Sequence, residues 1–138
     1  MRAEKTLVVL LRLCAGVLLL AIVPVFFPYS WMAAINREIG LGELPDTAIV
    51  SYLTRSLSAL YAFHGVIVLC LSFDVRRYLP LIICFAAVAV VFGVFMLLLD
   101  VYLGMPWHWT ICEGPVIIVA YGAIYALALG VKRQIRLV

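Results

Sequence analysis

The chain has 138 residues, of which 67% are hydrophobic and 12% are charged, and its net charge is +3. Because soluble globular domains carry about a quarter charged residues, this composition excludes a water-soluble protein and indicates an integral membrane protein. A chain of this length has room for one bundle of spans, each of ~20 apolar residues, and for little else. The basic residues are dispersed over short segments that flank apolar runs, so we expect no nucleic-acid partner.

Four apolar runs predict an all-α membrane protein, a four-transmembrane-helix bundle in a single domain of residues 1–138. The predicted spans are residues 6–27, 47–71, 79–100 and 111–131. Pro24 and Pro28 are expected to end the first span. Asp46 is expected to cap the second, and Pro80 to lie in the first turn of the third. A basic start before a Leu-rich run is also typical of a cleavable signal peptide, but Arg12 inside the run favours a retained span.

The segment between the first two spans, residues 29–44, predicts a short helix that lies in the membrane interface. Its apolar residues recur at helical spacing, opposite polar ones: Trp31, Ala34, Ile35 and Ile39. Gly40 and Gly42 would then end the helix and turn the chain into the second span. An irregular loop with an incidental pattern is the alternative.

The distribution of Lys and Arg predicts how the chain is threaded, because basic residues are retained on the cytoplasmic side of a membrane. Both termini and the turn between the second and third spans share one side, which carries Arg2, Lys5, Arg76, Arg77, Lys132, Arg133 and Arg136. The loops on the other side carry Arg37 as their one basic residue, together with all three tryptophans. We therefore expect cytoplasmic termini and a location in a bacterial inner membrane.

Small residues recur four apart in two of the spans. They are Ala89 and Gly93 in the third span, and Gly122, Ala126 and Gly130 in the fourth. Such stripes let helix backbones approach closely within a membrane. They predict tight packing, either inside the bundle or between copies of the chain.

Charged residues within spans are the best candidates for function, because a charge at a span centre costs about 2.5 to 3.5 kcal/mol on insertion scales. Arg55 lies in the second span, Asp100 ends the third and Glu113 opens the fourth, all in the outer half. Arg55 shares the small and polar face of its helix, and Asp100 continues a stripe of small residues. We expect these three to form a cluster that contains a buried ion pair of Arg55 with a carboxylate. A ligand site that Tyr52 and Trp107 also line is the alternative.

Structural interpretations of the same residues are also open. Thr110 and Glu113 have the T-x-x-E spacing of a capping box, in which Glu113 would bond back to the start of its helix. Asp100 lies close enough to the headgroups to be solvated. Arg12 lies close enough to the cytoplasmic boundary to extend its side chain back to it. His64 is expected to pack between helices, bonded to a carbonyl or a hydroxyl.

Spacing argues against several chemistries. His64 and His108 lie at different depths, so one haem could not easily take both as ligands. The four cysteines have neither the C-x-x-C pair of a thiol oxidoreductase nor the spacing of metal ligands. A small multidrug-type exchanger depends on a Glu in its first span, where this chain has Arg12. We therefore expect no catalytic residues, no metal, no cofactor and no enzymatic activity.

Three short motifs carry a resemblance to a known group of proteins. They are LLRL at residues 10–13 with Gly16, RSLSALY at residues 55–61 and DVRRY at residues 74–78, with a long aromatic outer loop between the first two. In this order they resemble the DoxX-like small four-helix membrane proteins over about half of the chain. The resemblance implies a four-helix bundle of the inner membrane. It also implies work beside a larger partner, since some members of the group are accessory subunits of redox complexes.

These observations predict a non-catalytic bundle that serves as an accessory or structural subunit. Its partners would be membrane lipid and the helices of a larger membrane complex or of a second copy of the chain. Two alternatives are open. The first is an outer-facing pocket for a small anionic or amphipathic ligand centred on Arg55, and the second is a proton-coupled small transporter that acts through Glu113.

Overall fold

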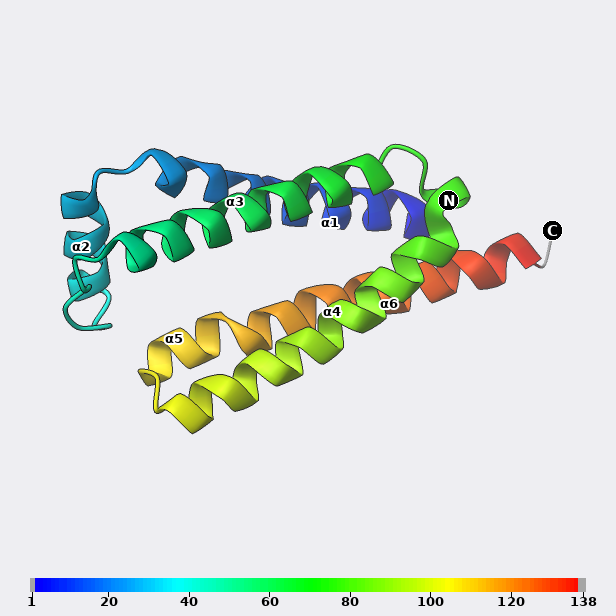
Figure 1. Cartoon of the computed structure of the whole chain (residues 1–138). Helices are drawn as coiled ribbons and strands as arrows, with labels where there is room; N and C mark the ends of the chain where they lie inside the picture. Colours follow the sequence, from blue (N-terminus) through cyan, green and yellow to red (C-terminus); the bar gives the residue numbers. More distant parts are fainter. Residues whose placement is uncertain (1, 137–138) are drawn as a thin grey trace. The chain divides into compact units, whose positions relative to one another are not determined.

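The computed structural model describes residues 2–136, and this part of the chain is all-helical, as predicted. Its elements are α1 (Arg2–Leu19), the 3-10 helix η1 (Leu20–Phe26), α2 (Tyr29–Glu38), α3 (Ala48–Leu71), α4 (Val75–Leu103), α5 (Trp107–Cys112) and α6 (Gly114–Arg136). Four stretches are long and apolar enough to cross a bilayer: Arg2–Phe26, Ala48–Leu71, Val75–Leu103 and Trp107–Ile135 (Figure 1). The prediction of an integral membrane protein with four membrane-length helices is confirmed.

The chain divides into two compact units. The first-hairpin unit, Cys14–Val68, contains the end of α1, η1, α2 and most of α3. The second-hairpin unit contains the chain up to Leu13 and from Leu69 onward, with α4, α5 and α6. A single domain that unites all four spans stays a prediction.

The first span changes from α-helix to 3-10 helix at Leu20. Proline has no N–H to donate to the carbonyl four residues earlier, and its ring collides with that carbonyl. Pro24 therefore prevents an α-helical bond to Leu20, and the chain tightens into 3-10 geometry. The backbone of Phe27 is extended and Pro28 precedes α2, so the two prolines end the span as predicted.

The predicted short helix between the first two spans is present as α2. Gly40 and Gly42 follow it with φ values of 76° and 86°, a left-handed backbone that favours glycine. The side-chain amide of Asn36 donates to the carbonyl oxygen of Gly42 at 2.8 Å, which folds the loop back onto the helix. These contacts turn the chain toward α3, as expected of the two glycines.

Tyr29 ties the start of α2 to the segment before α3. Its hydroxyl donates to the carbonyl oxygen of Leu44. Burial raises the pKa of the Tyr29 hydroxyl above its ordinary value, and the carboxylates of Asp46 and Glu43 raise it further. The hydroxyl is therefore protonated at neutral pH and available as a donor.

Within the first-hairpin unit, α3 packs closely against the end of α1. A Cβ added at Gly65 would lie 3.0 Å from Leu18 Cβ and 3.0 Å from the backbone nitrogen of Leu19. It would also lie 3.1 Å from the carbonyl oxygen of Ala15. Ala15 and Ala62 are buried as well. Small residues on both helices thus let the two backbones meet.

The predicted cap of α3 is wrong by one residue. α3 begins at Ala48, so its cap is Thr47, whose Oγ1 accepts from the backbone N–H of Val50 at 3.3 Å. An N-cap side chain must directly precede the first helical residue to reach the free N–H groups of the first turn. Asp46 lies one position too early for this role.

The predicted start of the third span is also wrong. The side chain of Asp74 accepts from the backbone N–H of Arg77 at 3.1 Å and caps α4 at Val75, four residues before the expected position 79. Pro80 consequently lies inside α4 rather than in its first turn. At the other end, Gly104 adopts φ 67° and ends the helix.

In the second-hairpin unit, α4 and α6 lie side by side (Figure 1). They meet at two glycines, Gly93 and Gly114. A Cβ added at Gly114 would lie 2.8 Å from Leu97 Cβ and 2.9 Å from both Leu97 N and the carbonyl oxygen of Gly93. A Cβ added at Gly93 would lie 3.1 Å from the carbonyl oxygen of Gly114. By contrast, a Cβ added at Gly122 or Gly130 would meet no atom within 4 Å. The stripe of the third span therefore serves packing inside the unit, whereas that of the fourth span does not.

Candidate functional site

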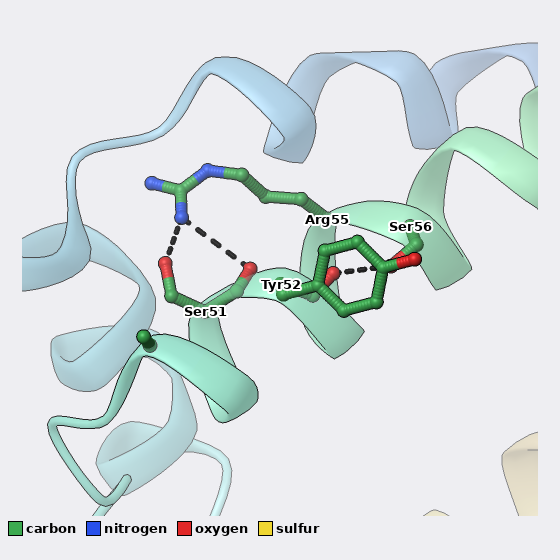
Figure 2. A pocket seen from close by; sticks show the side chains of 5 residues that line it. Ser51, Tyr52, Arg55 and Ser56 are labelled. Atoms are coloured by element: carbon green, nitrogen blue, oxygen red, sulfur yellow. Dashed lines mark hydrogen bonds between the residues drawn. The ribbon is translucent and has the colours of Figure 1, made fainter.

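Arg55 uses its guanidinium to bind backbone oxygens of its own unit. Nε donates to the carbonyl oxygen of Val25 at 3.2 Å, and Nη2 donates to that of Phe27 at 2.9 Å. Nη1 donates to the hydroxyl of Ser51 and to the Ser51 carbonyl oxygen at 3.4 Å. Figure 2 shows the side chain running along α3 toward Ser51. Four of the five guanidinium N–H groups thus have acceptors within the first-hairpin unit.

The two carbonyls are available because the first span ends at prolines. In a 3-10 helix, the carbonyl of Val25 would accept from residue 28, but Pro28 has no N–H. Phe27 lies beyond the helix in an extended conformation. The last carbonyls of a helix carry partial negative charge, and a cation near them is favourable. Arg55 therefore acts as a cap that joins α3 to the end of the first span.

A hollow on α3 lies beside this arginine. It has a volume of about 480 Å³, is open to the outside and is lined by Ala48, Ser51, Tyr52, Arg55 and Ser56. The ring of Tyr52 is exposed, and the hydroxyl of Ser56 donates to the carbonyl oxygen of Tyr52 (Figure 2). Two of the predicted ligand-binding residues, Arg55 and Tyr52, are thus brought together at one hollow.

Asp100 and Glu113 are neighbours in the second-hairpin unit. Asp100 is 3% exposed and lies one turn beyond Leu97 on α4, and Leu97 is the residue that touches Gly114. Glu113 directly precedes Gly114, and it interacts electrostatically with Asp100. The predicted inward stripe is buried at Ala86, Ala89, Gly93 and Asp100 and half-buried at Met96. The expectation that Asp100 is solvated is therefore wrong.

The predicted capping box at Thr110 is also wrong. Thr110 lies inside α5, and its hydroxyl donates to the carbonyl oxygen of Pro106 at 3.4 Å. Glu113 ends α5 and accepts from the indole N–H of Trp109 at 2.7 Å. The fourth span begins as the short helix α5, breaks at Glu113 and continues as α6. Because α5 already satisfies the backbone N–H of Glu113 through Trp109, there is no free helix start at Thr110 to cap.

The predicted cluster is distributed over both units. Arg55 and Tyr52 belong to the first-hairpin unit. Asp100, Glu113 and Trp107 belong to the second, where the exposed ring of Trp107 lies edge-on to His108 at 5.8 Å between centroids. An ion pair of Arg55 with either carboxylate stays a prediction.

The sequence analysis did not predict the hydrogen-bond partners of Arg55 and Glu113. The acceptors of Arg55 are backbone carbonyls, and the signal for them was Pro28, which removes a donor just after the first span. Ser51 stands four residues before Arg55, one helical turn away. Trp109 stands four residues before Glu113 in the same relation. Both spacings are visible in the sequence.

The other arginine within a span, Arg12, is exposed. Its extension to the cytoplasmic boundary stays a prediction. Its guanidinium carbon lies 5.9 Å from the ring centroid of Phe73, a cation–π contact within the second-hairpin unit. In the same unit, Arg76 makes two bonds to the carboxylate of Glu4, at 2.8 and 3.0 Å. Exposed contacts of these kinds contribute little to stability.

Among residues 2–136, no three His, Cys, Asp or Glu side chains lie close enough together to hold a metal ion. Comparisons of the chain with protein-family models, with curated protein sequences and with solved structures found no match. The resemblance to the DoxX-like group stays a prediction.

Proposed function

We propose that this chain is a non-catalytic accessory subunit of a bacterial inner-membrane complex, with its termini in the cytoplasm. It acts by packing against lipid and against a transmembrane helix of a partner protein. The distribution of basic residues supports the orientation, since arginine and lysine gather at the ends assigned to the cytoplasm.

The hydrogen bonding of Arg55 is the main support for this proposal. An ionisable residue within a span is a functional candidate by default. Here the guanidinium satisfies two carbonyls that the prolines of the first span leave available, and it binds Ser51 as well. An arginine whose hydrogen bonds go to the backbone of its own chain contributes to folding. Contacts with other molecules are then made by the outer surface of the helices.

The exposed face of α6 supports a helix as the partner. Gly122, Ala126 and Gly130 form a small-residue stripe, Ala126 is exposed, and the two glycines have open space beside them. Inside the second-hairpin unit, Gly93 and Gly114 already show what such residues do in this chain, which is to bring two backbones together. A partner helix could approach the stripe in the same way.

Site-specific photo-crosslinking in native membranes tests this proposal. A photoreactive residue at Ala126 is expected to give one discrete adduct with another protein. The control is the same residue at Val91, which is 69% exposed on α4 and is expected to contact lipid. Replacing Gly122 and Gly130 by Leu should abolish the Ala126 adduct. An adduct within the same chain, or equal protein adducts at both positions, would contradict the proposal.

A ligand site at the α3 hollow is the second candidate function. The open hollow of about 480 Å³ beside Arg55 favours it, since one guanidinium N–H lacks an acceptor in the first-hairpin unit. An anionic lipid added to detergent-solubilised protein should then raise its unfolding temperature. Tyr52→Ala should abolish this rise, whereas Leu53→Ala, at a neighbouring exposed position outside the hollow, should not. Equal stabilisation of both variants would exclude the hollow as the site.

A further inference from the structure

Asp100 is a buried acid with an unpaired oxygen. Its side chain is 3% exposed, and its Oδ2 is buried without a hydrogen-bond partner. An unpaired polar atom in a protein interior costs about 1 to 3 kcal/mol, and more when it carries charge. Such an atom is stable when a water, a ligand, an ion or a proton compensates it.

The group that compensates Asp100 must also be compatible with the nearby carboxyl group of Glu113. Glu113 interacts electrostatically with Asp100, and one of its carboxylate oxygens, Oε2, accepts from the indole of Trp109 at 2.7 Å. The close contact of Gly114 with Leu97 holds the start of α6 against α4 directly beside the two acids. Two like charges held together in this way repel each other, so the fully ionised pair is unfavourable.

Few other ionisable groups lie on the helices that surround the pair. Nearest in sequence are Tyr102 on α4 and His108 and Cys112 on α5, all three of which are exposed. The others apart from Arg and Lys lie about 12 Å or more from the pair along their helices: Tyr78 and Cys84 on α4, and Tyr121 and Tyr125 on α6. The Arg and Lys residues of α4 and α6 lie at the opposite helix ends. Arg77 is about 35 Å from Asp100 along α4, and Lys132 is about 28 Å from Glu113 along α6. Neither helix therefore brings a basic side chain to the two carboxyl groups.

We propose that Asp100 and Glu113 form a proton-binding site, in which the two carboxyl groups share one proton at neutral pH. The proton lies on Oδ2 of Asp100, because this is the buried oxygen that lacks a hydrogen-bond partner. The protonated Asp100 becomes a hydrogen-bond donor, and repulsion between the acids becomes attraction. This inference is independent of the proposed partner helix.

The chemistry of the site favours a proton over a metal ion. Divalent cations in proteins take several oxygen ligands, with Ca²⁺ binding 6 to 8 of them. Within residues 2–136, the pair has no third His, Cys, Asp or Glu near enough to complete a metal site. A proton needs one oxygen to hold it and one to share it, which two carboxyl groups supply.

The pH dependence of stability tests the proposal. In the unfolded chain both carboxyl groups are ionised above about pH 5, because ordinary Asp and Glu titrate near 4. If the folded state retains a proton, it binds more protons than the unfolded state, so stability falls as pH rises. Between about pH 5 and 8, the unfolding temperature of the wild type should fall relative to that of Asp100→Asn, which carries no titratable proton at this position.

The matched control is Glu38→Gln, which removes an exposed carboxylate at the end of α2 and should follow the wild-type pH profile. A temperature difference between wild type and Asp100→Asn that does not change with pH would overturn the proposal. So would stabilisation of the wild type by Na⁺ in place of acid, because that result assigns the site to a metal cation.

Infrared spectroscopy of the wild type keeps the proposal testable if Asp100→Asn does not fold. At pH 7, a carbonyl band of a protonated carboxylic acid is expected, and it should shift when aspartate carries a carbon isotope in its carboxyl group. Absence of the band, or a band unaffected by labelled aspartate, would overturn the assignment of the proton to Asp100.

Discussion

Replacing Gly114 by Ala is expected to lower the free energy of unfolding by about 2 to 3 kcal/mol, the upper part of the range for overpacked interiors. The new Cβ would lie 2.9 Å from the backbone nitrogen of Leu97 and from the carbonyl oxygen of Gly93. Backbone atoms of α4 cannot rotate away as a side chain can. The two helices must therefore separate, and other contacts along their interface weaken.

Gly122→Ala is the matched control on the same helix. A Cβ at Gly122 meets no atom within 4 Å, and Ala favours a helix over Gly by about 1 kcal/mol. Stability of this variant should therefore be unchanged or slightly higher. Unfolding by denaturing detergent, followed by tryptophan fluorescence, gives both values. Equal stability of the two variants would contradict the close approach of α4 and α6 at Gly114.

Arg55→Leu is expected to destabilise the protein by about 1 to 3 kcal/mol without any added ligand. The substitution leaves the carbonyl oxygens of Val25 and Phe27 without the donor that now binds them, at about 1 to 3 kcal/mol for each unpaired group. Relief of the cost of holding a charge in a span offsets part of this loss. Thermal unfolding of purified protein in mild detergent measures the net effect.

Two further variants test whether the lost hydrogen bonds cause the destabilisation of Arg55→Leu. Arg55→Lys keeps the charge but has one nitrogen in place of three, so it cannot reach both carbonyls and Ser51 at once and should recover only part of the stability. Arg12→Leu removes an exposed arginine of another span and should cost about 1 kcal/mol or less. If Arg55→Leu is as stable as the wild type, the guanidinium is not a structural cap, and a ligand role at the hollow gains support.

The sequence predicted the four membrane-length helices because hydropathy reports the environment of each segment and needs no knowledge of contacts. Local boundaries were less predictable. α4 begins at Val75, where Asp74 caps it, and not near Pro80. The hydrogen bond from a free N–H to the Asp74 side chain decides the helix start, although proline is common in a first turn. The break at Glu113 was missed because the T-x-x-E spacing favoured a helix start at Thr110, whereas this residue lies inside α5.

The candidate site was predicted in part. Charge rules identified Arg55 and Asp100 as exceptional, and helical periodicity correctly turned Asp100 inward. The partners of Arg55 escaped prediction because backbone carbonyls are the same in every residue, and their availability depends on where a helix ends. The division into two compact units depends on contacts between distant segments, which hydropathy and spacing do not report.

The composition of the particle extracted from its own membrane is the most direct test of the proposed accessory role. Extraction into lipid nanodiscs with a polymer, followed by native mass spectrometry, preserves the neighbours of a membrane helix. We expect the chain to be recovered with a second membrane protein at a fixed ratio, and this protein should be lost when Gly122 and Gly130 are replaced by Leu. Recovery of the wild-type chain with lipid alone would contradict the account.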